Sequence, residues 1–114
     1  MQRIINESGQ QIAYIRNNII FNNVDDTVVG IKIGDCCFGR QPLVIGKIIQ
    51  GKVYLLNGEI TGICQSYTVP NEKFASREQL IDAWDILASI SDHTCPWIIT
   101  TEQWSDTPFL DHLK

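Results

Sequence analysis

A small residue recurs four times in the first half of this 114-residue chain, at intervals of 17, 16 and 16 residues. The four small residues are Ala13, Gly30, Gly46 and Gly62. Each stands four residues after a turn-forming position, which is Gly9, Asp26, Pro42 or Gly58 in turn. Four unrelated strands would rarely keep such an offset, so the pattern indicates an internal repeat of one supersecondary unit.

Each repeat unit predicts two short strands around a turn. Asn57-Gly58 is the strongest hairpin signal and predicts a type I′ turn, in which both central residues have positive φ. A second set of turn signals at Asn17-Asn18, Gly34-Asp35 and Gln50-Gly51 separates the units. Glycine inside a strand usually indicates a close backbone approach, so we expect hairpins that meet around a common axis. The eight predicted strands are 3–6, 11–15, 19–22, 27–33, 36–38, 43–48, 52–55 and 59–64.

The repeat stops after residue 65, and one amphipathic helix is predicted over 76–90. Ser76 and Gln79 match a capping box at its start. Asp82, Asp85 and Ser89 lie opposite an apolar stripe, which we expect to cover one open face of the hairpins. Pro96 and Pro108 argue against a helix in the tail, 96–114, which is expected to form a last strand or an arm. The stripe consists of Leu80, Ile81, Trp84, Leu87 and Ala88.

The order of hairpins and helix resembles the four-fold β-flower family of small, mostly bacterial proteins. The likeness covers residues 3–65, and the segment 53–63 (VYLLNGEITGI) is the best match to the family's repeat. Asp26 and Pro42 replace the turn glycine in the second and third units. The resemblance implies one mainly β domain with α (α+β) over 1–114, in which four hairpin repeats surround a pseudo-four-fold axis. It implies no catalytic residue.

Composition excludes several classes of protein. The formal net charge is −4, and the basic residues are scattered singly, which argues against a nucleic-acid partner. No segment approaches the length of apolar sequence that a membrane helix needs, so we expect no membrane partner and a cytoplasmic location. The hydrophobic content of 44% suits a chain that folds without disulfides, so the four cysteines are predicted to be reduced.

The cluster that best suggests chemistry is His93 with Cys95. A histidine beside a thiol can generate a nucleophilic thiolate, which would make the protein a thiol-dependent enzyme. The same pair could bind zinc together with Cys64 or Cys36, although paired CxxC spacing is absent. The plain alternative is that His93 caps helix carbonyls while Cys95 fills the core. We favour this alternative and expect no catalytic residue, metal or cofactor.

Two further pairs of titratable residues are explained without a site. Asp111-His112 could form an acid–base pair, but we expect the terminus to fray. Asp25-Asp26 could bind a cation, although an ordinary hairpin turn accounts for both residues. The chain has neither a Walker-type nucleotide loop nor a Gly-x-Ser-x-Gly elbow.

The prediction of function depends on whether the three tryptophans are exposed. If Trp84, Trp97 or Trp104 is exposed, it can anchor a partner protein or a second copy of the chain. The predicted function is a non-enzymatic binding scaffold that forms a homo-oligomer or binds another protein or a small ligand. A third hypothesis is that the protein sequesters a small anionic signal molecule in a pocket between subunits, which requires basic residues to converge there. The basic residues in question are Arg16, Lys32, Arg40 and Lys47.

Overall fold

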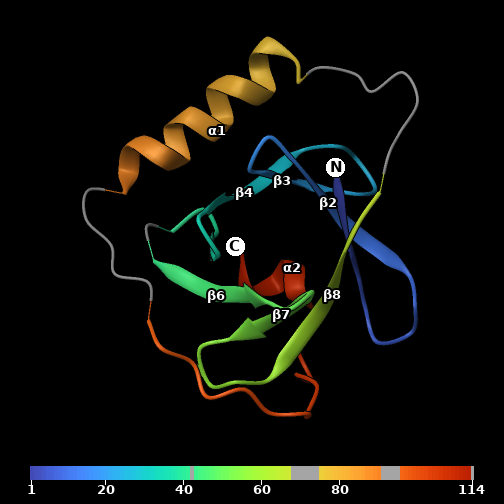
Figure 1. The fold of residues 1–114 in the computed structure, drawn as a ribbon. Helices are drawn as coiled ribbons and strands as arrows, with labels where there is room; N and C mark the ends of the chain where they lie inside the picture. The colour runs from blue at the N-terminus through green and yellow to red at the C-terminus, as the bar shows by residue number, and fades with distance from the viewer. Residues whose placement is uncertain (42, 68–74, 91–95, 114) are drawn as a thin grey trace.

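The computed structural model describes residues 1–41, 43–67, 75–90 and 96–113. Eight antiparallel strands form a closed barrel, in which each strand pairs with the next along the chain and β8 pairs with β1 (Figure 1). The strands are β1 (Gln2–Ile5), β2 (Gln11–Arg16), β3 (Ile19–Asn22), β4 (Val28–Ile33), β5 (Cys36–Phe38), β6 (Val44–Ile49), β7 (Lys52–Leu55) and β8 (Ile60–Ser66). Helix α1 (Arg77–Ser89) and the short helix α2 (Phe109–His112) follow. The predicted strands are therefore confirmed to within two residues at each end.

The same register irregularity occurs once in each hairpin. The pairing shifts directly after Ile4, Ile20, Cys37 and Val53 on the first strand of the four hairpins. These four residues stand opposite the small residues Ala13, Gly30, Gly46 and Gly62, respectively. All four are completely buried. A bulge increases local twist and bends its strand, which helps such short strands close into a barrel.

The recurring glycines are required by close contact with a neighbouring strand. A Cβ atom on Gly30 would lie 2.2 Å from the backbone oxygen of Phe38, and one on Gly46 would lie 2.2 Å from that of Tyr54. At Gly62 the nearest atom would be Cγ2 of Ile4, at 2.7 Å. No side chain fits at the first two positions unless the backbone moves. A close backbone approach is therefore confirmed at Gly30 and Gly46. It lies between adjacent hairpins, whereas the prediction placed it around a common axis.

The turns differ from the prediction at Asn57-Gly58. Only Gly58 has positive φ there, and its N–H donates to the Leu55 carbonyl, so the type I′ turn was wrongly placed. Gly9 and Asp26 also have positive φ at the corresponding positions of the first two hairpins. Paired positive φ values occur instead between hairpins, at Asn17-Asn18 and at Gln50-Gly51. The turns that join β2 to β3 and β6 to β7 therefore have the positive φ values of a type I′ turn, whereas at Gly34-Asp35 only Gly34 has positive φ.

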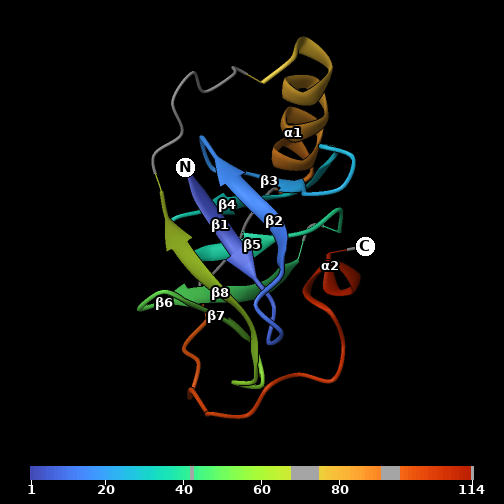
Figure 2. The same ribbon diagram turned by 90° about the vertical axis from the view of Figure 1, so that its right-hand side faces the viewer.

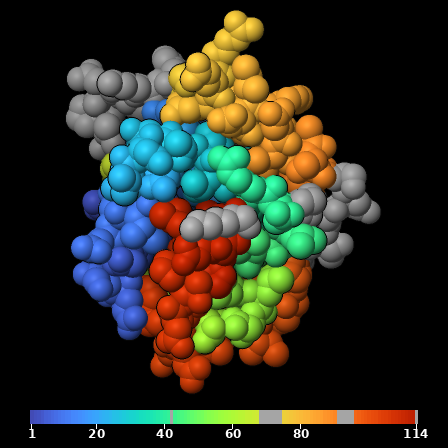
Figure 3. Space-filling model, turned by 180° about the vertical axis from the view of Figure 1, so that it is seen from behind, coloured from blue at the N-terminus to red at the C-terminus, as the bar shows by residue number. Residues whose placement is uncertain are grey.

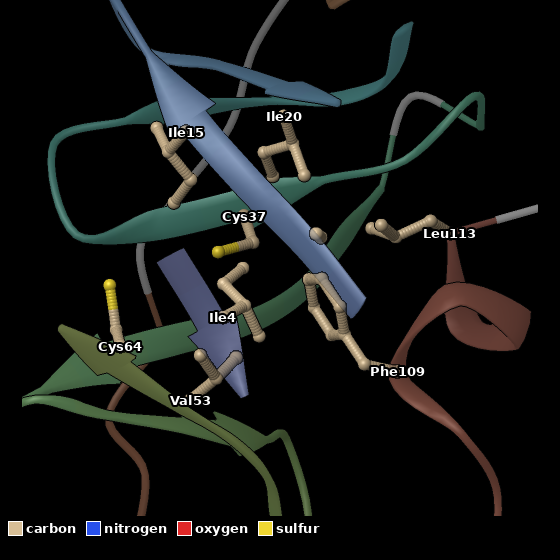
Figure 4. Packing of buried hydrophobic residues seen from close by; sticks show 9 residues of the cluster. Ile4, Ile15, Ile20, Cys37, Val53, Cys64, Phe109 and Leu113 are labelled. Atoms are coloured by element: carbon tan, nitrogen blue, oxygen red, sulfur yellow. The ribbon is translucent and has the colours of Figure 1, made fainter. Parts of the chain in front are cut away.

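Helix α2 closes one end of the barrel. Phe109 and Leu113 are each only 1% exposed and belong to the same core cluster as Ile4, Ile20 and Val53 (Figure 4). The Leu113 carbonyl accepts from the Arg40 N–H. In Figure 3 this C-terminal segment, in red, fills the middle of a face surrounded by the blue, cyan and green strands.

Two predictions about the tail are therefore wrong. The terminus does not fray around Asp111-His112, because the apolar residues on either side of this pair are buried in the barrel. Pro108 does not prevent a helix either. It is the N-cap of α2, a position that requires no backbone N–H.

Residues 96–108 form an extended arm across the β7–β8 turn (Figure 1). The Thr101 N–H donates to the Gly58 carbonyl, and Ile60 is bonded to the arm through both its N–H and its carbonyl. Trp104 makes a parallel bridge with Ile60, and Ile98 is buried against Tyr54 and Ile60. The tail was predicted to form either a last strand or an arm, and in residues 96–108 the structure has the arm.

Helix α1 lies on the outside of the barrel, across β3 and β4 (Figures 1 and 2). The predicted capping box is present, because Ser76 and Gln79 exchange side-chain and backbone hydrogen bonds. The Gln79 side chain also donates to the Asp26 carbonyl and so joins the start of α1 to the β3–β4 turn. Ala83 and Ile86 are the buried residues of the helix.

Candidate interaction surface

The apolar stripe of α1 does not cover the barrel, contrary to the prediction. The helix packs through Ala83 and Ile86 instead, against a cluster that includes Ile19, Phe21 and Ile31. Trp84 is 67% exposed, and the other three large members of the stripe are 39–51% exposed. We use the name "α1 stripe" for these four side chains, Leu80, Ile81, Trp84 and Leu87.

Helical geometry explains how the α1 stripe remains outside. Successive residues turn by about 100°, so Ala83 and Ile86 point roughly a quarter of a turn or more away from the centre of the stripe near Trp84. The hydrophobic pattern therefore predicted the helix correctly but not the side of it that is buried.

A groove runs between α1 and the end of β4. It has a volume of about 430 Å³, and Leu80, Trp84 and Leu87 form its helical wall. Ile31 and Ile33 of β4 form the opposite wall together with Lys32. The groove is therefore mainly apolar, with a single cationic residue among those that line it.

The charges on α1 lie away from the groove. Glu78, Asp82 and Asp85 occupy the opposite side of the helix, and the last two line a separate pocket beside Arg40. The only basic residue of α1 is Arg77, at its start. A basic flank is what an amphipathic helix uses to bind an anionic membrane surface, so this helix is poorly suited to that role.

The other two tryptophans differ in exposure. Trp97 is 90% exposed on the arm, next to Ile99, which is also exposed, while Trp104 is partly buried against Ile60. Trp97 lines a second pocket, of about 550 Å³, with Lys47 and Asp35. The structure therefore brings together Trp84 and the groove, and it places Trp97 and Trp104 elsewhere on the surface.

Two of the residues singled out for chemistry, His93 and Cys95, lie outside the described residues. Cys64 is a free thiol whose pKa is raised by burial, which is the opposite of what an activated nucleophile needs. Cys36 is disulfide-bonded, so the prediction that the cysteines are reduced is wrong for that residue. Disulfides depend on the redox compartment as well as on the size of the core, and sequence composition reports only the core.

The remaining acidic pair has a structural explanation. Asp25 accepts hydrogen bonds from the hydroxyl and the N–H of Thr27, and these bonds lower its pKa. Asp26 accepts a hydrogen bond of 2.8 Å from the Tyr14 hydroxyl. Burial, and then this hydrogen bond, raise the pKa of Tyr14 to about 12. Both carboxylates are used by the hairpin turn and its neighbours.

The basic residues of the anion hypothesis do not converge. Lys32, Lys47 and Arg40 line three different pockets of the described chain. The guanidinium of Arg16 lies over the Phe21 ring, 5.3 Å from its centroid. This arrangement does not support an anion-binding pocket within one copy of the chain.

No family model, curated protein or solved structure matches this chain. No helix among the described residues is long and apolar enough to cross a membrane. The evidence that the groove is an interaction site is therefore its geometry alone. The sequence identified its helical wall but missed the wall formed by β4. The signal available was that 28–33 is apolar throughout except for Lys32, which indicates a strand covered on its outer side as well.

Proposed function

We propose that this protein is a non-enzymatic interaction scaffold that self-associates through the α1 stripe. The observation that carries this proposal is the exposure of Trp84, between Leu80 and Leu87, on a helix that is already docked through other residues. Contiguous exposed apolar patches on a protein surface often mark interaction sites.

The spacing of the stripe supports a second copy as the occupant. Leu80, Trp84 and Leu87 are separated by four and then three residues, which is the spacing of the seam between two paired helices. Ile81 and Ala88, which flank this seam, carry no charge. Because the acidic residues lie on the far side of the helix, two α1 helices can meet along the stripe without bringing like charges together. A two-fold dimer is the commonest closed assembly and requires only such a self-complementary patch.

The barrel supplies rigid support for this surface. We also propose that its four hairpins are related by a pseudo-four-fold axis, as in the β-flower family. The support is the repeated pairing of a buried residue with a small one, from Ile4 with Ala13 to Val53 with Gly62. The cytoplasmic location stays a prediction, and the disulfide at Cys36 favours an oxidising compartment instead.

Sedimentation of matched tryptophan variants tests the proposed function. The parent protein is expected to form a dimer at micromolar concentration, and Trp84→Ser is expected to be a monomer with an unchanged circular dichroism spectrum. Trp97→Ser is the control, because it removes an even more exposed indole away from the groove. A monomeric parent, or dissociation caused by Trp97→Ser and not by Trp84→Ser, would contradict the proposal.

A further inference from the structure

A small pocket lies under the arm, far from the α1 stripe in sequence. It has a volume of about 180 Å³ and is formed by the β1–β2 turn, the irregular part of β8 and the arm just before α2. Its lining includes Glu7, Ile12, Thr61, Trp104, Asp106 and Phe109. This volume is below the 300–1,000 Å³ of pockets that hold drug-sized ligands, so only a molecule of a few heavy atoms fits.

Thr61 is the polar exception among four equivalent residues. The register of each hairpin leaves one extra residue on its second strand, and in the first three hairpins this residue is Ile12, Val29 or Ile45. These three are aliphatic and pack against the barrel core. In the fourth hairpin the extra residue is Thr61.

The Thr61 hydroxyl has no hydrogen-bond partner in the described part of the chain. Thr61 is 5% exposed, and its Oγ1 atom is buried. Burying an unpaired hydroxyl costs stability, whereas valine has nearly the same shape and carries no such cost. A hydroxyl at this position is therefore accounted for best if something in the pocket bonds to it.

The charges around the pocket favour a cation. Glu7 and Asp106 both line it, and no lysine, arginine or histidine does. Trp104, which is only partly buried, supplies aromatic surface, and such surface also attracts a cation. The described residues contain no group of three or more metal-ligating side chains, so a metal ion is a poorer match than an organic cation.

We propose that this pocket binds a small aliphatic primary ammonium ion. The Thr61 hydroxyl accepts one of its N–H groups, Glu7 and Asp106 balance its charge, and the alkyl part lies against Ile12 and Trp104. Such an ammonium group is carried by free alkylamines, by polyamines and by the end of a lysine side chain. The proposal is independent of self-association through α1.

Titration with n-butylammonium, followed by the NMR signals of Thr61 and Trp104, tests the proposal. Saturable shifts confined to residues around the pocket are expected. The neutral analogue n-butanol and calcium chloride are run in parallel, and both are expected to bind at least about tenfold more weakly, because one charge-assisted hydrogen bond is worth about that factor. Equal binding of n-butanol, preferential binding of calcium, or no saturation by n-butylammonium would overturn the proposal.

Variants separate the pocket from the fold. Thr61→Val keeps the shape of the side chain and installs the residue type of the other hairpins, so the variant is expected to fold and to lose affinity for n-butylammonium by about tenfold. Asp106→Asn is expected to weaken binding similarly. Glu102→Gln makes the same change of charge at an exposed arm residue that does not line the pocket, and it should bind as the parent does. Parent-like affinity in both Thr61→Val and Asp106→Asn would contradict the assignment.

Discussion

The two helices use their apolar residues in opposite ways. Helix α1 has 13 residues, yet only Ala83 and Ile86 are buried, and its larger side chains face outward. Helix α2 has four residues. Its first residue, Phe109, and Leu113, which directly follows the helix, are both enclosed by the barrel. The longer helix is thus a surface element, whereas the shorter one is part of the core.

This difference shows that the strength of a helical pattern does not measure how much a helix contributes to the fold. A long amphipathic sequence has enough apolar surface both to dock and to offer a second face to a partner. A four-residue helix has little intrinsic stability and exists because its side chains are buried. We therefore expect substitutions in α2 to affect the stability of the fold and substitutions in the α1 stripe to affect association.

The largest expected effect is at Phe109. Phe109→Ala should lower the free energy of unfolding by about 3–5 kcal/mol, because it removes a fully buried ring from the end of the barrel. Urea denaturation measures this change. Trp97→Ala, which removes an exposed aromatic side chain from the same arm, should change the free energy by less than about 0.5 kcal/mol. Equal effects of the two substitutions would mean that α2 does not close the barrel.

Two isoleucines on α1 allow the buried and the exposed side of one helix to be compared. Ile86→Ala should destabilise the fold by about 2–4 kcal/mol, because Ile86 is buried against the barrel. Ile81→Ala changes the same residue type where it is half exposed, and it should cost less than about 1 kcal/mol at protein concentrations too low for association. If Ile81 proved the costlier of the two, the stripe would face the barrel and the orientation of α1 described here would be wrong.

Substitutions at two glycines test the close contacts between neighbouring strands of the barrel. Gly46→Ala should destabilise by about 1–3 kcal/mol, since the new methyl group meets the rigid backbone oxygen of Tyr54. Gly62→Ala should cost less, because the nearest atom there belongs to the side chain of Ile4, which can change its rotamer. Thermal unfolding of both variants measures the difference, and the reverse order would show that the crowding arises elsewhere.

The smallest effects concern the thiol of Cys37, which shares the core cluster with Phe109. Burial, and next the nearby Cys64, raise the pKa of Cys37 from 9.0 to about 12. The folded state therefore holds this proton more tightly than the unfolded state, so the contribution to stability is complete below pH 9 and is lost as the pH rises toward 12. The raised pKa of Tyr14 acts in the same direction from pH 10 upward.

Alkylation of Cys37 at pH 8 provides the measurement. The reaction should proceed only through opening of the barrel, and Phe109→Ala should accelerate it by the factor by which it raises the population of the open state. Rapid alkylation of Cys37 in the folded parent protein would contradict a closed barrel.

The strands and their hairpins were predictable because their determinants are local, whereas the closure of the hairpins into a barrel was not predicted. Turn residues such as Gly9 and Gly58 mark where strands end. The alternation of apolar and polar residues between successive turns predicts the strands themselves. The spacing of Ala13, Gly30, Gly46 and Gly62 also predicted a close backbone approach. Their actual contacts, with the next hairpin, depend on a register that single strands do not encode.

The parts that could not be predicted depend on contacts distant in sequence. Phe109 and Leu113 look like an ordinary tail until the open end of a barrel is available to receive them. The stripe on α1 was recognised, but its partner surface was not, because Ala83 and Ile86 are a modest apolar pair beside Trp84 and Leu87. The pocket at Thr61 emerges only when the four hairpins are aligned by register.

The central claim is that the Trp84 side of α1 faces a second copy of the chain. Isotope-filtered NOE spectroscopy on an equimolar mixture of labelled and unlabelled protein tests it most directly. Intermolecular NOEs are expected from the Trp84 indole ring to the methyl groups of Leu80 or Leu87 of the other chain. A spectrum in which Trp84 shows NOEs only to its own chain, at concentrations where the protein is associated, would contradict the claim.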